Sequence, residues 1–120
     1  MAVKKPEFDF ENFDEEQALA DAVDSLGVKI AFGNGLFAGK FPSGEVVTVP
    51  LDIPRKLFDA TDFDGMDPVE QITTLLGAMG LEDKADVVLE QGYIAALVFA
   101  EKFFTTIHKV MKVSLGEFGS

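Results

Sequence analysis

A change of apolar period along the chain constrains the fold more than any other feature of the sequence. Residues 28–51 alternate with a period of two and are divided by turn residues, which predicts three strands at Val28–Phe32, Leu36–Phe41 and Glu45–Leu51. Pro50 has no N–H, so the third strand ends there or lies at a sheet edge. Residues 53–113 follow a helical period. We therefore expect an α+β fold, in which a small antiparallel hairpin or meander (about residues 28–51) joins a mainly helical C-terminal body.

Four further segments have helical patterns or start signals. Residues 15–26 carry one apolar stripe and acids in the first turn, which predicts a short helix. Pro54 fits the first turn of another short helix, with Asp52 or Ile53 near its cap. Asp67 precedes Pro68, which indicates a capped helix start, and Gly80 suits its end. Residues 81–90 predict one more short helix before the long pattern over residues 93–113.

The last helical pattern has two apolar faces, which together exceed the width expected for one side of a surface helix. One face holds Ile94, Leu97, Val98, Phe104, Ile107 and Met111, and the other holds Phe99, Phe103 and Val110. Such a helix is either central to the core or covered on one side by a partner. We take Phe99, Phe103 and Val110 as the candidate partner-binding residues. Burial of all three in the intramolecular core, or their use in self-association, are the alternatives.

The length of 120 residues suits a single domain. We expect an acidic, aromatic N-terminal arm over residues 1–16, one α+β domain over residues 17–113 and a flexible tail over residues 114–120. The arm alternates Phe8, Phe10 and Phe13 with acidic residues. It is either a solvated tail or a short linear motif whose phenylalanines dock on a partner or a neighbouring copy.

The charge and residue composition exclude several classes of partner. Ten basic and twenty-one acidic residues give a formal net charge of −11, which opposes binding to nucleic acid and to anionic lipid. No segment has the roughly 20 apolar residues of a membrane span. The absence of cysteine excludes disulfides and thiolate metal sites. We therefore expect a cytosolic protein that binds neither nucleic acid nor membrane.

The sequence contains no pattern typical of a catalytic, metal or cofactor site. His108 is the single histidine and has no cysteine to join it as a metal ligand. Asp59, Asp62, Asp64 and Asp67 surround Gly65, but no frame through them matches the glycine and glutamate positions of a calcium loop. No phosphate-binding glycine motif or nucleophile elbow occurs. We expect no enzyme activity, no metal and no cofactor.

The sequences VTVPLDIPRKL at residues 47–57 and VSLGE at residues 113–117 resemble those of tail assembly chaperones of long-tailed, siphovirus-type actinobacterial phages. Residues 47–57 are similar to the step from hairpin to helix in that family. Residues 113–117 are similar to the family's ending after a long helix. The family often has Trp in this helix, where the chain has Phe103 and Phe104, and it usually continues Gly-Glu-Ser, where the chain has Phe118.

The resemblance implies a function and a set of partners. Family members bind the tape measure protein, help recruit tail tube protein subunits and are absent from the mature virion. They are made as a short form and as a longer form, through ribosomal frameshifting near the codons for Leu115-Gly116-Glu117. On this resemblance the chain is the short form, a homo-oligomer in the host bacterial cytoplasm that also meets the longer form. A minor tail or head-completion protein of a phage or prophage is the alternative.

Overall fold

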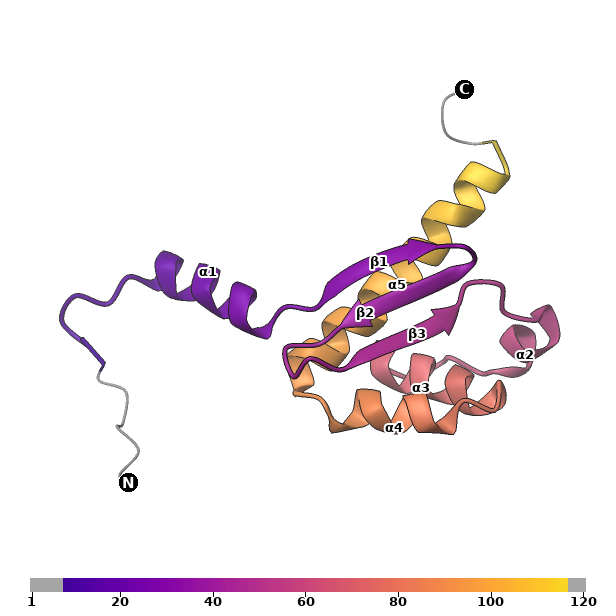
Figure 1. Ribbon diagram of the computed structural model, residues 1–120, viewed down its shortest axis with the longest axis horizontal. Helices are drawn as coiled ribbons and strands as arrows, with labels where there is room; N and C mark the ends of the chain where they lie inside the picture. The colour runs from indigo at the N-terminus through magenta and orange to yellow at the C-terminus, as the bar shows by residue number, and fades with distance from the viewer. Residues whose placement is uncertain (1–7, 117–120) are drawn as a thin grey trace.

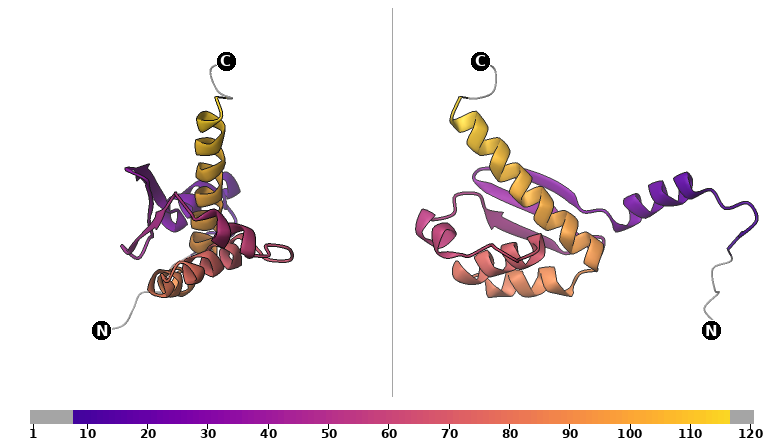
Figure 2. Two further views of the ribbon diagram at one scale, coloured as in Figure 1. Left: turned by 90° about the vertical axis from the view of Figure 1, so that its right-hand side faces the viewer. Right: turned by 180° about the vertical axis from the view of Figure 1, so that it is seen from behind.

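A computed structural model describes residues 8–116 and confirms the α+β fold. The elements are α1 (Glu15–Leu26), β1 (Lys29–Gly33), β2 (Leu36–Lys40), β3 (Val46–Pro50), α2 (Arg55–Ala60), α3 (Pro68–Ala78), α4 (Glu82–Glu90) and α5 (Tyr93–Ser114). The three strands form an antiparallel meander in the order β1-β2-β3. Helix α5 crosses one face of this sheet, and α3 and α4 lie on the side of β3 (Figures 1 and 2). None of the helices within residues 8–116 has the length and apolar character needed to span a membrane.

Local sequence sets the two hairpins. Asn34 and Gly35 both have positive φ, 53° and 77°, which is the backbone of a two-residue type I′ turn between β1 and β2. The turn aligns Phe32 with Phe37 and Ile30 with Gly39. The longer loop before β3 is closed by the Phe41 N–H, which donates to the Glu45 carbonyl oxygen at 2.9 Å. β3 ends at Pro50 and lies at a sheet edge, as its missing N–H predicts.

Helix α3 begins and ends with the signals that the sequence contains. The Asp67 carboxylate accepts a hydrogen bond from the Glu70 N–H at 2.9 Å, and proline occupies the first turn. At the other end Gly80 has a φ of 76°, and the Leu81 N–H donates to the Leu76 carbonyl oxygen at 2.8 Å. This Schellman arrangement satisfies the last carbonyl groups of the helix and turns the chain directly into α4.

Helix α1 forms where its pattern predicts, but it projects from the body instead of packing within it (Figure 1). The Asp14 carboxylate caps it by accepting from the Gln17 N–H. None of its residues is buried in the described part of the chain. The arm is expected over residues 1–16, but Glu15 and Glu16 belong to α1, so the arm ends before that helix. The expected tail begins after α5, which includes Ser114, and residues 117–120 lie outside the described part.

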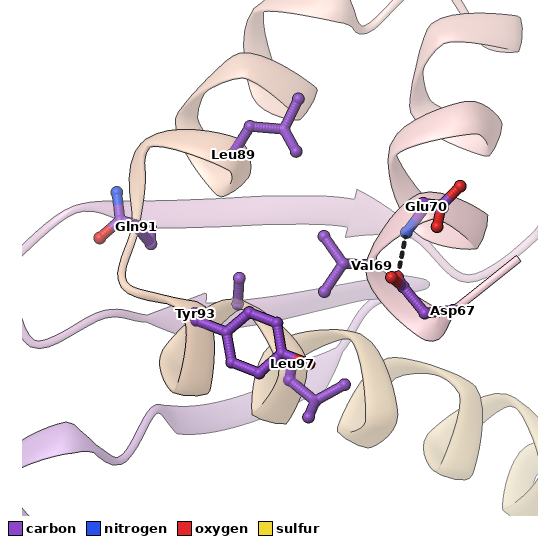
Figure 3. A pocket seen from close by; sticks show the side chains of 8 residues that line it. Asp67, Val69, Glu70, Leu89, Gln91, Tyr93 and Leu97 are labelled. Atoms are coloured by element: carbon purple, nitrogen blue, oxygen red, sulfur yellow. Dashed lines mark hydrogen bonds between the residues drawn. The ribbon is translucent and has the colours of Figure 1, made fainter.

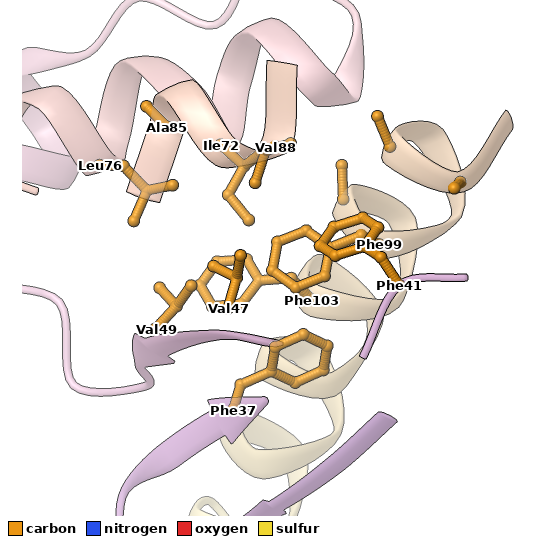
Figure 4. Close-up of a cluster of buried hydrophobic side chains, with 13 residues drawn as sticks. Phe37, Phe41, Val47, Val49, Ile72, Leu76, Ala85, Val88, Phe99 and Phe103 are labelled. Atoms are coloured by element: carbon orange, nitrogen blue, oxygen red, sulfur yellow. The ribbon is translucent and has the colours of Figure 1, made fainter. Parts of the chain in front are cut away.

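The core lies between the sheet and the helices and is built around phenylalanine (Figure 4). The Phe37 ring lies 5.6 Å from the Phe99 ring and 5.4 Å from the Phe103 ring, centroid to centroid, both edge to face. Phe41 covers the other side of Phe99 at 5.1 Å. Edge-to-face rings add about 0.5–1.5 kcal/mol per pair beyond their buried area. These four rings join β2 to α5.

The absence of a side chain at Gly39 permits this close packing of α5 on the sheet. A Cβ built at Gly39 would lie 2.3 Å from Cδ1 of Phe99, far inside van der Waals contact. The phenyl ring of Phe99 therefore rests on the backbone of β2. The requirement at Gly39 is for space, and its φ is not in the left-handed region.

We expect Gly39→Ala to lower the free energy of unfolding by about 1–3 kcal/mol, because the added methyl group overpacks a rigid aromatic core. Urea unfolding followed by circular dichroism measures the change. Gly33→Ala is the matched control, since a Cβ at Gly33 meets nothing within 4 Å. Equal stability of the Gly39→Ala and Gly33→Ala variants would contradict the packing described here.

Candidate protein-binding surface

The structure corrects the predicted partner-binding residues of the last helix. Phe99 and Phe103 are fully buried, with 0% of either residue exposed, and they pack against the sheet. A partner cannot reach them while the chain is folded, so the prediction that they form a surface is wrong. Their burial follows from the small residues on the same face of α5, at Ala95, Ala96 and Ala100, which let the helix approach the sheet closely.

Val110 differs from the other two predicted residues because the C-terminal part of α5 extends past the end of the sheet (Figure 1). Val110 is 38% exposed, and Met111 and Val113 are more exposed still. The helix is therefore central to the core in its first half and open to solvent in its second half. Val110 is accessible to a partner, and its part in binding stays a prediction.

An apolar groove lies between α1 and α5. It has a volume of about 370 Å³ and a lining that is apolar except at one lysine. We call it the α1–α5 groove; its lining residues are Leu19, Ala22, Val23, Leu26, Gly27, Val28, Ile94, Val98 and Lys102. Side chains of both walls are open to solvent, with Val23 69% and Ile94 52% exposed. Its shape and lining suit the apolar face of a helix from another protein.

The sequence already contained the residues of this groove, but it did not indicate their role. The α1 stripe of Leu19, Val23 and Leu26 has the same spacing as a core-facing stripe. Ile94 and Val98 belong to the face of α5 that the pattern suggested for the core. Only the tertiary structure shows that the core uses the other face of α5 and leaves Ile94 exposed and Val98 half-buried.

A second hollow lies where α3, α4 and α5 meet, on another side of α5 (Figure 3). Tyr93 and Leu97 of α5 face Val69 of α3 across it, and Leu89 adds apolar surface from α4. Tyr93 is 79% exposed. Asp67, Glu70 and Gln91 make this hollow more polar than the α1–α5 groove. It is therefore less suited to an apolar helix.

The N-terminal arm presents its predicted aromatic residues to solvent. Phe8, Phe10 and Phe13 are 72%, 88% and 66% exposed, and the first two rings lie on one side with centroids 6.1 Å apart. Asp9 sits between those two. Hydrogen bonds from the side-chain amide and the backbone N–H of Asn12 lower the pKa of the Asp9 carboxyl group.

The aspartates around Gly65 and the single histidine either lie apart or form local hydrogen bonds and ion pairs. Asp67 caps α3, the Asp62 carboxylate accepts from the Asp64 N–H in a turn, and Asp59 pairs with Arg55 on the exposed surface of α2. His108 is exposed on the projecting part of α5. No group of three or more potential metal ligands occurs within residues 8–116.

Comparisons of the chain with protein-family models, with curated proteins and with solved structures find no match.

We expect Phe103→Ala to lower the free energy of unfolding by about 3–5 kcal/mol, because it leaves a cavity among Phe37 and Phe99. Val110→Ala, on the exposed part of the same helix, should change it by no more than about 0.5 kcal/mol. Thermal or urea unfolding measures both. Similar losses in the two variants would contradict the division of α5 into a buried half and an open half.

Proposed function

We propose that this chain is a non-catalytic protein-binding module that holds apolar helical segments of another protein. The observation that carries the proposal is the α1–α5 groove, whose two apolar walls are solvent-exposed while the chain has a separate, well-packed core. Contiguous exposed apolar surface marks interaction sites in soluble proteins. The net charge of −11 keeps such a surface soluble between binding events.

Within this class we propose a tail assembly chaperone of a long-tailed phage, in its short form. It binds the tape measure protein, a long chain with apolar helices, and helps recruit tail tube subunits in the host cytoplasm. It leaves before the virion is complete. The support is the likeness of residues 47–57 and 113–117 to that family, together with a groove of the kind that such a client requires.

The groove, together with the open end of α5, replaces the buried phenylalanines as the proposed client-binding surface. Leu19 and Val23 supply one wall and Ile94 and Val98 the other. Val110 lies on the other face of α5, in the part of the helix that extends past the sheet, and is a separate exposed apolar residue. The contact is apolar and non-covalent, so it requires no cofactor. Its strength depends on how much of the client's apolar area the groove removes from water.

The proposal is tested by co-expressing the chain with the tape measure protein of the same phage and measuring how much of that protein stays soluble and co-purifies. We expect the double substitution Val23→Asp and Ile94→Asp to weaken binding by about tenfold or more, because the contact would bury unpaired carboxylates. Both side chains are exposed, so the variant should fold. Val46→Asp, at a 57% exposed position on β3, is the matched control and should bind normally.

Two outcomes would change the conclusion. Normal binding by the double variant would show that the client uses another surface. Failure of the unaltered chain to bind, together with its presence in purified virions, would exclude the chaperone function and favour a minor structural protein of the tail or head.

A further inference from the structure

The two edges of the sheet differ in how far other parts of the chain cover them. At the β3 edge, Nζ of Lys84 in α4 donates to the Thr48 carbonyl oxygen at 2.6 Å and to its hydroxyl at 2.8 Å. Pro50 has no N–H to present at that edge. At the β1 edge, no strand pairs within residues 8–116, and all five β1 residues are exposed. An open edge of this kind is a template for another strand.

The register identifies which β1 groups are available. Gly33 and Leu36 flank the two-residue turn and form a hydrogen-bonded pair, so alternate residues Ala31 and Lys29 also bond to β2. The N–H and C=O groups of Ile30 and Phe32 therefore point away from the sheet. Their side chains lie on the helix-covered face, because they pair with core-facing Gly39 and Phe37, yet they remain 37% and 56% exposed.

The opposite face of the same edge is basic. Lys29 lies directly opposite Lys40, both are exposed, and neither makes an ion pair within the described part of the chain. Like charges directly opposite each other destabilise a strand pair. A strand added to β1 would therefore fit best with apolar side chains toward the helices and acidic side chains toward the two lysines.

The N-terminal arm has this pattern. In an extended backbone, Phe8 and Phe10 point to one face and Asp9 and Glu11 to the other. With the two phenylalanines beside Ile30 and Phe32, the two acids fall on the side of the lysines. The arm is exposed and now contains a turn, in which the Asn12 side chain donates to the Asp9 carboxylate at 3.1 Å. Docking replaces these exposed local hydrogen bonds with strand pairing.

The position of the arm indicates whether it can pair with β1 of its own chain or with β1 of a second copy. Helix α1 follows directly on the arm and holds it on the far side from β1 of its own chain (Figure 1). We propose that the open edge of β1 binds the arm of a second copy of this chain, residues Phe8–Glu11, as a fourth strand. Exchange of arms between two copies joins them through both edges. This inference does not depend on the identity of the client protein.

The test uses purified full-length chain alone, with two charge-reversed variants. One carries Asp9→Lys and Glu11→Lys, and the other carries Lys29→Glu and Lys40→Glu. In either variant alone, the arm and the sheet edge carry charges of the same sign and repel each other. Sedimentation velocity should therefore show self-association weakened by at least about tenfold. An equimolar mixture restores both complementary contacts and should associate like the original chain. Circular dichroism checks that both variants fold.

The control for total charge is Asp86→Lys with Glu90→Lys on α4, an equal change at exposed positions outside the arm and the edge. It should leave association unchanged. A second variant, Phe8→Ser with Phe10→Ser, should weaken association without altering charge. The proposal is overturned if the original chain is monomeric, if both charge-reversed variants associate as it does, or if their mixture fails to regain association.

Discussion

The packing of Phe99 onto the backbone of β2 at Gly39 is the contact on which the rest of the structure depends. A three-stranded sheet of five-residue strands has little stability in water unless a face is covered. Helix α5 covers that face, and it approaches closely because a glycine lies beneath Phe99 and alanines flank it. Phe37 and Phe103 then complete an aromatic core that also receives Ile72 and Leu76 from α3.

This use of α5 determines what the chain leaves exposed. The large side chains on the sheet-facing side of α5 are buried in the core. Ile94, on another side of the helix, remains at the surface beside the apolar stripe of α1. The C-terminal part of the helix has no sheet beneath it and exposes Val110 and Met111. The packed core and the solvent-exposed apolar surface thus lie on different parts of one helix.

The sheet shows a comparable division between its edges. The β3 edge carries a hydrogen bond from Lys84 and a proline, whereas β1 keeps its hydrogen-bonding groups, two exposed apolar side chains and a lysine that makes no ion pair within residues 8–116. Natural sheets usually protect an open edge because it promotes aggregation. Here the high negative charge opposes non-specific association, while an acidic aromatic arm of the same chain complements the edge.

The sequence by itself determined the local structure. The periods of two and 3.6, the Asn34-Gly35 turn, the Asp67 cap and the Gly80 helix end each act over a few residues, and the structure has each element where these signals lie. Tertiary structure alone decided which side of α5 is buried. Both sides are apolar, and the choice depends on the space at Gly39, which lies sixty residues away from Phe99 in the chain. Tertiary structure also places α1 outside the core, where its ordinary apolar stripe forms one wall of a groove.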